Sequence, residues 1–215
     1  MYMNNLHVAE PIVYVIDDDQ DICNSLMFLL ESVQLEVKTF NSAVEFLAYE
    51  RPATPSCLIL DIRMRGMSGL QLQNHLNMQK IKVPIIFMSG HGDIPMSVSA
   101  MKAGAFDFLE KPFNPQHMLN QIQDCLQQAE RDFIEQADRQ KQQAKLQSLS
   151  PRENQIINLL VDGLSSKQIA QMLTISHKTV EIHRTHIHQK LGTESIAQMV
   201  NMVLMCRGVK LQAAG

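Results

Sequence analysis

Short hydrophobic runs alternate with segments of helical periodicity over the first 125 residues of the chain. The runs have the length of strands, and the segments between them repeat hydrophobic residues every three or four positions. This alternation is typical of a parallel sheet covered by helices on both faces. We therefore predict a doubly wound α/β domain with a five-stranded parallel sheet. Strands are expected near residues 12–17, 35–39, 57–61, 83–88 and 106–109, and helices near 20–32, 42–49, 69–78, 94–103 and from 115 onward.

The second strand differs from the others because its polar and apolar residues alternate. Leu35 and Val37 share one face of this strand, whereas Glu36 and Lys38 share the other. One polar face fits a strand at the edge of a sheet better than a central strand, which is buried on both sides.

From Pro115 to about Gln147 the chain contains no glycine and no second proline. Hydrophobic residues keep helical spacing as far as Phe133, after which glutamines take the same positions. The pattern predicts one long helix whose second half, residues 126–147, is a solvated linker. A coiled coil between two protomers remains an alternative interpretation.

A second domain is predicted to begin at residue 148. Ser150, Pro151 and Glu153 provide a helix cap, a proline at the first helical position and an acid in the first turn. Four short helices should follow, near residues 151–161, 165–173, 176–190 and 195–206. The predicted organisation is therefore an α/β domain over residues 1–125, a helical linker over 126–147 and a small all-α domain over 148–215.

Composition favours a soluble cytoplasmic protein without a membrane partner. Hydrophobic residues make up 45% of the 215 positions, and no stretch approaches the roughly 20 apolar residues of a membrane span. No secretion signal is recognisable at the N-terminus. The four cysteines lack metal-ligand spacing and are expected to be buried thiols.

The charges are unevenly distributed around a net charge of −3. Residues 1–125 carry 14 acidic and 8 basic side chains, whereas residues 150–215 carry 4 acidic and 7 basic ones together with four histidines. An acidic front suits a metal site, and a basic tail suits a polyanion such as nucleic acid.

Polar side chains follow four of the predicted strands at the point where each strand ends. They are Asp17 and Asp18, Asp61, Ser89, and Lys111. The carboxyl ends of parallel strands meet at one edge of a sheet, so these groups should lie together. Three neighbouring carboxylates repel one another unless a cation lies among them, and all-oxygen ligands suit Mg2+. The set suits a divalent metal and a phosphoryl group.

With these motifs in this order, residues 10–125 resemble the receiver domain of bacterial response regulators, which has a flavodoxin-like fold. The resemblance implies that Asp61 is the phosphoacceptor. It also implies that Asp18 and Asp61 bind Mg2+ directly, that Asp17 acts through water, and that the backbone carbonyl of Arg63 completes the protein's ligands.

The resemblance also assigns residues that would respond to the phosphoryl group. Lys111 would pair with its oxygens, the Lys111–Pro112 peptide bond would be cis, and Ser89 would donate its hydroxyl. Phe108 would be the switch aromatic that moves with Ser89. One position departs from the family, because Arg65 stands where a proline is usual; the loop after Asp61 should therefore be less rigid.

The segment from Ser165 to Lys190 has the pattern of a helix-turn-helix. Val180, Ile187 and Leu191 share a face that should be buried, and the opposite face is polar. Such a helix suits the major groove of DNA. Base contacts are assigned to Lys178, Glu181, Ile182 and Thr185, and phosphate contacts to Lys167, Arg184, His188 and Lys190. Metal binding by the histidines is disfavoured because they point in different directions around the helix.

The motifs Leu149 to Glu153, Ile169-Ala170, Lys178 to Arg184 and Lys190-Leu191 resemble the LuxR-type DNA-binding domain. The whole chain thus resembles a two-component response regulator of the FixJ/NarL subfamily. This implies a transcriptional regulator, with activation favoured over repression, and not an enzyme. The implied partners are a sensor histidine kinase, promoter DNA, RNA polymerase and a second copy of the chain, bound on phosphorylation or on DNA. Dimerisation is expected around Met96, Val98, Met101 and Lys102. Two alternatives remain, a DNA-binding regulator with a phosphorylation-independent receiver and an aspartyl-phosphate enzyme.

Overall fold

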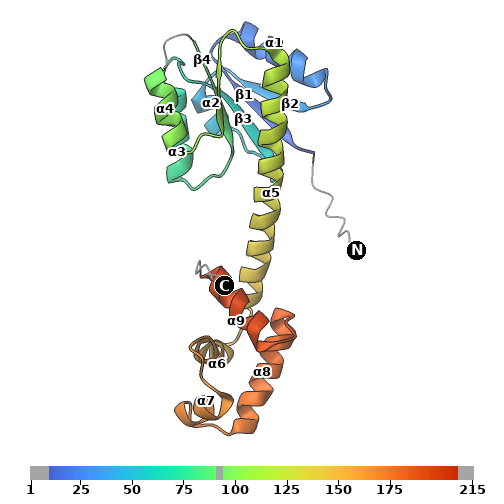
Figure 1. The fold of residues 1–215 in the computed structure, drawn as a ribbon, viewed down its shortest axis with the longest axis vertical. Helices are drawn as coiled ribbons and strands as arrows, with labels where there is room; N and C mark the ends of the chain where they lie inside the picture. The colour runs from blue at the N-terminus through green and yellow to red at the C-terminus, as the bar shows by residue number, and fades with distance from the viewer. Residues whose placement is uncertain (1–9, 91–93, 208–215) are drawn as a thin grey trace, which may run out of the picture. The chain divides into compact units, whose positions relative to one another are not determined.

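The first part of the chain folds around one parallel sheet. The computed structural model describes residues 10–90 and 94–207. The strands pair in the order β2-β1-β3-β4-β5, and every pairing is parallel (Figure 1). This confirms the predicted doubly wound sheet. The strands are β1 (Ile12–Ile16), β2 (Glu36–Phe40), β3 (Ser56–Asp61), β4 (Ile85–Ser89) and β5 (Asp107–Glu110).

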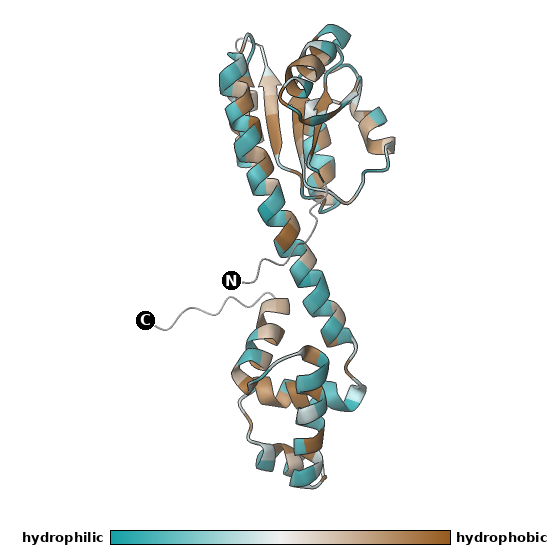
Figure 2. Ribbon diagram, turned by 90° about the vertical axis from the view of Figure 1, so that its right-hand side faces the viewer, coloured by the Kyte–Doolittle hydropathy of each residue, from teal (hydrophilic) through white to brown (hydrophobic). Residues whose placement is uncertain are grey.

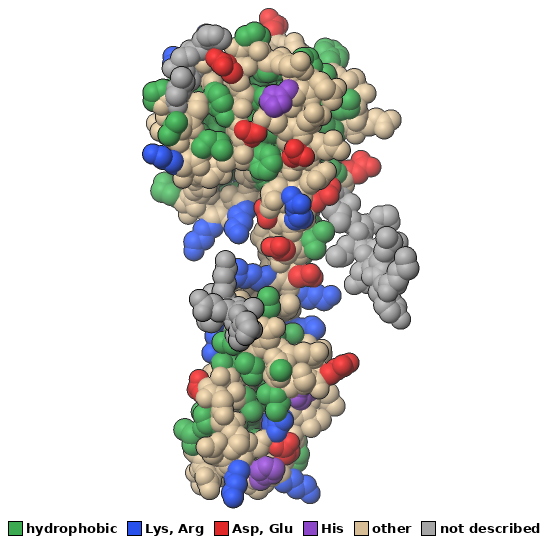
Figure 3. All heavy atoms as spheres, viewed as in Figure 1, with side chains coloured by type: hydrophobic (Ala, Val, Ile, Leu, Met, Phe, Trp, Pro, Cys, Tyr) green, Lys and Arg blue, Asp and Glu red, His purple; other side chains and the backbone are tan. Residues whose placement is uncertain are grey.

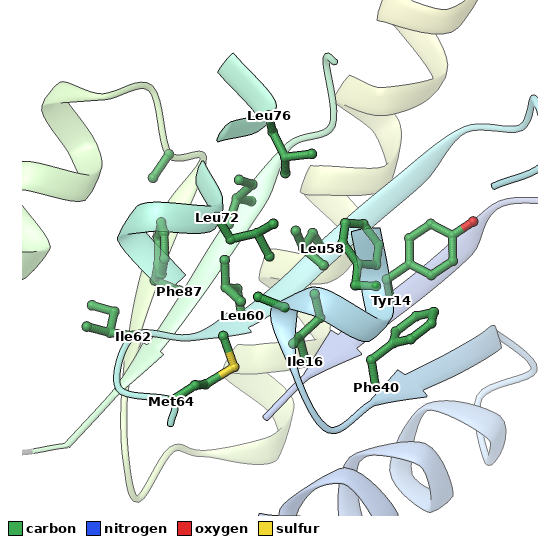
Figure 4. Packing of buried hydrophobic residues seen from close by; sticks show 14 of the residues in the cluster. Tyr14, Ile16, Phe40, Leu58, Leu60, Ile62, Met64, Leu72, Leu76 and Phe87 are labelled. Carbon is green, nitrogen blue, oxygen red and sulfur yellow. The ribbon is translucent and has the colours of Figure 1, made fainter. Parts of the chain in front are cut away.

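Helices cover both faces of the sheet because successive side chains of each strand point to opposite faces. Val13 and Val15 pack with α1 (Gln20–Glu31) and α5 (Pro115–Gln147). Tyr14 and Ile16 pack on the other face, where Phe40, Leu72 and Phe87 complete the core shown in Figure 4. That face is covered by α2 (Ala43–Ala48), α3 (Gly69–Met78) and α4 (Ile94–Lys102).

The strand boundaries agree with the prediction to within two residues. The second strand lies at the sheet edge as expected, with Glu36 and Lys38 exposed. The fourth strand begins at Ile85, two residues later than predicted. Pro84 has no N–H to donate to a ladder, although its carbonyl accepts from the Leu58 N–H.

The helix α5 is continuous over 33 residues, as the sequence predicted. The chain nevertheless divides inside it into two units, the first ending at Ile134 and the second beginning at Glu135. Residues 134–141 of the helix are exposed, and most of the helix beyond its hydrophobic middle stretch is coloured as hydrophilic in Figure 2. The end of α5 belongs to the second unit, where Leu146 packs on the core and Lys145 Nζ donates to the Leu191 carbonyl at 3.0 Å.

The second unit contains the four predicted short helices. They are α6 (Pro151–Val161), α7 (Ser166–Met172), α8 (His177–Leu191) and α9 (Ile196–Cys206). A serine caps the N-terminus of each helix by accepting a backbone N–H. The turn between α7 and α8 places Thr174 at φ 54°, a strained conformation for a β-branched residue. No helix in residues 10–90 or 94–207 is long and apolar enough to cross a membrane.

Candidate functional site

A buried ionic cluster lies at the carboxyl edge of the sheet. Lys111 directly follows β5, and its Nζ is 2.7 Å from Asp17 Oδ2 and 2.7 Å from Asp61 Oδ1. Asp17 follows β1 and Asp61 ends β3, and both carboxylates are buried. The Lys111–Pro112 peptide bond is cis, as expected, and the Lys111 N–H donates to the Ser89 carbonyl at 2.7 Å. The structure thus brings together Asp17, Asp61 and Lys111, three of the residues predicted to meet at this edge of the sheet.

The pKa values of both Asp61 and Lys111 are shifted upward in this cluster. Burial raises the pKa of Asp61 above its usual value, and the hydrogen bond and charge of Lys111 offset only part of this shift. Burial alone would lower the pKa of Lys111, but its hydrogen bonds to Asp17 and Asp61 outweigh burial and raise it. Lys111 is therefore charged at neutral pH and supplies the positive charge that both carboxylates share.

Ser89 adds a hydroxyl to this edge of the sheet. It ends β4, one position beyond the Met88 that pairs with Asp61, and only 1% of the residue is exposed. Among the described residues its Oγ has no hydrogen-bond partner. A buried hydroxyl without a partner is unfavourable, so this donor is available to an acceptor that enters the pocket.

Asp18 contacts the loop that follows Asp61. Its Oδ2 accepts the Arg65 backbone N–H at 3.2 Å and lies 3.6 Å from Arg65 Nε. In residues 10–90 and 94–207 no three acidic, histidine or cysteine side chains are close enough together to hold a metal ion. The predicted trio of Asp17, Asp18 and Asp61 is therefore not assembled here, and the contact with Arg65 was not foreseen from the sequence.

Two further residues surround the cluster. Phe108 on β5 is half-buried and packs against the core on the α3 side of the sheet. Gly69 was not singled out from the sequence, yet it begins α3 directly against β3. A Cβ on Gly69 would lie 2.3 Å from the backbone oxygen of Asp61. Only glycine allows this approach, so Gly69 sets the distance between α3 and the backbone of Asp61.

The second unit presents α7 and α8 as a candidate DNA interface. Val180, Ile187 and Leu191 are buried as predicted. The predicted base-contacting residues Lys178, Ile182 and Thr185 are exposed on the opposite face, and the predicted phosphate-contacting Lys167 is exposed on α7. Lysine, arginine and histidine side chains appear on the surface formed by these helices (Figure 3).

Two predicted DNA-contacting residues bind each other. Arg184 Nη1 donates to Glu181 Oε1 at 2.7 Å and to Ser166 Oγ at 2.6 Å. The Ser166 hydrogen bond, followed by the charge of Arg184, lowers the pKa of Glu181, although burial opposes this shift. Glu181 is therefore ionised and held beside the exposed face of α8, where Arg184 fixes its carboxylate.

The remaining two predicted contacts lie near the C-terminal end of α8. Lys190 Nζ is 2.7 Å from Glu153 Oε2, and His188 Nδ1 is 3.0 Å from the Thr193 carbonyl. Lys190 therefore has an intramolecular partner 37 positions away in sequence, which helical periodicity could not indicate.

The ion pair of Glu153 predicts a pH-dependent stability for the second unit. Burial alone would raise the pKa of Glu153, but hydrogen bonds from Lys190 and Ser150 outweigh it and lower the pKa to about 2. A carboxyl group with a lowered folded pKa stabilises the fold above its unfolded pKa, and this contribution disappears as pH falls through the folded value. Glu153→Gln should therefore lower the free energy of unfolding by about 2 kcal/mol at pH 7, and by progressively less below about pH 5.

Urea unfolding of wild type and Glu153→Gln between pH 3 and 7 would measure this difference. The exposed Glu194 provides a matched control, because Glu194→Gln should change stability by less than about 0.5 kcal/mol at every pH. A Glu153→Gln deficit that stays constant with pH would show that the loss is steric and not ionic.

Comparison with known proteins identifies both units. Residues 13–123 match the family model of the response regulator receiver domain, and residues 147–203 match that of the bacterial regulatory proteins of the luxR family. The transcriptional regulatory protein TdiR of Thauera aromatica is 43% identical over 89% of this chain and 85% of its own length. The transcriptional regulatory protein FixJ of Bradyrhizobium diazoefficiens is 39% identical over 89% of this chain and 94% of its own length.

A solved structure agrees with these relatives over nearly the whole chain. The response regulator StyR, 43% identical, superimposes with a TM-score of 0.81 over 92% of this chain and 100% of its own. Both domains are therefore matched in the same order, within relatives of similar length. The chain belongs to the FixJ-type response regulators of two-component systems, in which a receiver domain precedes a LuxR-type DNA-binding domain.

Proposed function

We propose that Asp61 accepts a phosphoryl group from a sensor histidine kinase and thereby controls how this regulator binds promoter DNA. The observation that carries the proposal is the partly buried Lys111 ammonium 2.7 Å from both Asp61 and Asp17. An Asp61 oxygen attacks the phosphorus, the bond from phosphorus to the donor's histidine nitrogen breaks, and that nitrogen leaves with the electron pair. Lys111 then pairs with the phosphoryl oxygens, and the unpartnered hydroxyl of Ser89 donates to one of them.

The donor set also has the chemistry of a magnesium site, although its carboxylates are not assembled around one point. All its donors are oxygens, which Mg2+ prefers. Asp17, Asp18, Asp61 and the backbone carbonyl of Arg63 are the groups that would hold the ion. When bound, Mg2+ would supply positive charge to the phosphoryl oxygens.

Phosphorylation would switch the receiver by adding charge to a small buried space. The added group carries roughly −1.5 to −2 charges, and it binds best where Lys111 and Ser89 reach it together, so it favours that state of the receiver. Movement of Ser89 would draw in the half-buried Phe108 and reshape the adjacent α4 surface. Val98 and Met101 are exposed on α4, and they suit dimerisation of the phosphorylated chain.

The dimer would place two α8 helices on a two-half promoter site in the cytoplasm. Lys178, Glu181, Ile182 and Thr185 would contact base edges, and Lys167, Arg184, His188 and Lys190 would contact or position the backbone. Activation through RNA polymerase is the outcome we propose. The relatives TdiR and FixJ are transcriptional regulatory proteins, which supports a role in transcription for this chain.

Covalent labelling tests the phosphoacceptor directly. Wild-type protein should gain one phosphoryl group from a small phosphodonor in the presence of Mg2+, whereas Asp61→Asn should gain none. Asp19→Asn is the matched control, because Asp19 caps α1 by accepting the Asp21 N–H and asparagine can do the same; it should label like wild type. An unlabelled wild type would favour the phosphorylation-independent receiver, and continuous turnover of a phosphate ester would favour the enzyme.

Lys167→Ala should weaken DNA binding on every sequence and flatten its dependence on salt. A lysine that neutralises one phosphate releases about one counterion, so the slope of log K against log salt should fall by about one unit. Fluorescence anisotropy at several salt concentrations measures this slope. The exposed Lys82 of the first unit serves as a control, and equal slopes for wild type and Lys167→Ala would refute the phosphate contact.

A further inference from the structure

Arginine at position 65 gives Asp18 two contacts that proline could not provide. The Arg65 backbone N–H donates to Asp18 Oδ2 at 3.2 Å, and Arg65 Nε lies 3.6 Å from the same oxygen. Proline has no backbone N–H and no charged side chain. Both contacts therefore depend on the departure from the usual receiver sequence.

Two side-chain cations already contact the three carboxylates of the proposed phosphoacceptor site without a metal ion. Lys111 forms ion pairs with Asp17 and Asp61, and Arg65 forms one with Asp18. Together the two side chains bring two positive charges, the same charge as one Mg2+ ion. The three carboxylates are not assembled around one point in the described part of the chain, and Asp18 is the one that contacts Arg65. The contact with Arg65 therefore opposes assembly of the three oxygen donors.

We propose that Arg65 is an intramolecular competitor of Mg2+ for Asp18. To reach a metal ion, Asp18 has to leave Arg65 Nε, and the arriving divalent charge is repelled by the nearby guanidinium. The Arg65 side chain is 97% exposed, so water and salt screen the effect and the side chain can swing away. The inference rests on the proposed metal-dependent phosphoacceptor role of the pocket.

The expected change in the Mg2+ dissociation constant follows from the interaction between exposed charges that lie a few ångströms apart. Such interactions change a dissociation constant by about three- to tenfold at low ionic strength. Arg65 would thus raise the Mg2+ concentration at which the pocket fills, and it would make receiver activation sensitive to free Mg2+.

Isothermal titration of Mg2+ into the full chain at low salt tests the proposal. Arg65→Met keeps the backbone N–H and the unbranched side chain but removes the charge, and it should lower the Mg2+ dissociation constant about three- to tenfold. Arg65→Lys keeps the charge and should stay within about twofold of wild type. Arg51→Met removes the same charge at Arg51, which precedes β3 and stacks over Phe46, and it should also resemble wild type.

Salt provides an independent readout that a change in loop structure would not reproduce. At 1 M KCl the Debye length falls to about 3 Å, so wild type and Arg65→Met should converge. Equal affinities of wild type and Arg65→Met at low salt would overturn the role of Arg65 while leaving the metal site intact. If neither wild type nor Arg65→Met binds Mg2+ and both remain folded in thermal melts, the result would contradict both the metal-dependent site and the role of Arg65.

Discussion

Replacing Gly69 with alanine should destabilise the receiver by about 3 kcal/mol, because the added methyl group has no space. The new Cβ would lie 2.3 Å from the Asp61 backbone oxygen and 3.1 Å from side-chain atoms of Leu60 and Phe87. The strand cannot easily yield, since Asp61 pairs with Met88 in the sheet. The start of α3 would have to move, and the backbone that positions the proposed phosphoacceptor would be disturbed with it.

Denaturant unfolding of the full chain, followed by phosphodonor labelling of the folded variant, measures both effects. Gly90→Ala is the matched control, because no heavy atom lies within 4 Å of its added Cβ and its stability should change by less than about 0.5 kcal/mol. Gly69→Ala should also label more slowly than Gly90→Ala. A Gly69→Ala variant as stable as Gly90→Ala would contradict the close packing of α3 on Asp61.

Lys111→Met should lower the free energy of unfolding by about 2–3 kcal/mol at pH 7 in buffer without Mg2+. The substitution leaves the Asp17 and Asp61 carboxylates without their shared cation. Removing one partner of a buried ion pair is strongly destabilising, although the partial exposure of Lys111 reduces the loss.

The pH dependence of this loss has a definite sign. Burial already raises the pKa of Asp61, and loss of Lys111 should raise it further. A carboxyl group whose folded pKa exceeds its unfolded value, about 4, destabilises the fold increasingly as pH rises from the unfolded to the folded value, and the penalty is constant above that. Unfolding measured between pH 4 and 8 should therefore show a small deficit at pH 4 and the full deficit at neutral pH.

Asp61→Asn provides the partner for a double-mutant cycle with Lys111→Met. Removing the Asp61 charge should recover much of the stability that Lys111→Met loses, giving a coupling free energy of about 1–3 kcal/mol. Additive losses in the single and double variants, or a deficit independent of pH, would show that Lys111 contributes through packing of its side-chain methylenes.

The fold was predictable because each sequence pattern has one simple structural cause. Continuous apolar runs mark strands buried on both faces, the alternation over Glu36 to Phe40 marks the edge strand, and serine caps mark the starts of the short helices. Groups that follow parallel strands share one edge of the sheet, which is why Asp17, Asp61 and Lys111 meet.

The details that the sequence did not indicate depend on distances set by the whole fold. Lys190 binds Glu153 across 37 positions, and Arg184 binds Glu181 instead of projecting freely. Gly69 matters because a helix start meets the backbone of β3. The contact between Asp18 and Arg65 joins residues 47 positions apart in sequence. Helical spacing allows the pair of Glu181 and Arg184, which are three positions apart, but it does not select that pair over contacts with DNA. The pairing of Lys190 with Glu153 has no periodicity that a sequence could display.

The central claim, that phosphorylation of Asp61 controls DNA binding, is tested most directly by the full chain bound to genomic DNA fragments with and without a small phosphodonor. The occupied promoter sites should be bound at least about tenfold more tightly by phosphorylated wild type, and Asp61→Asn should not respond to the donor. Wild-type protein that labels on Asp61 yet binds the same sites with the same affinity in both conditions would contradict the account.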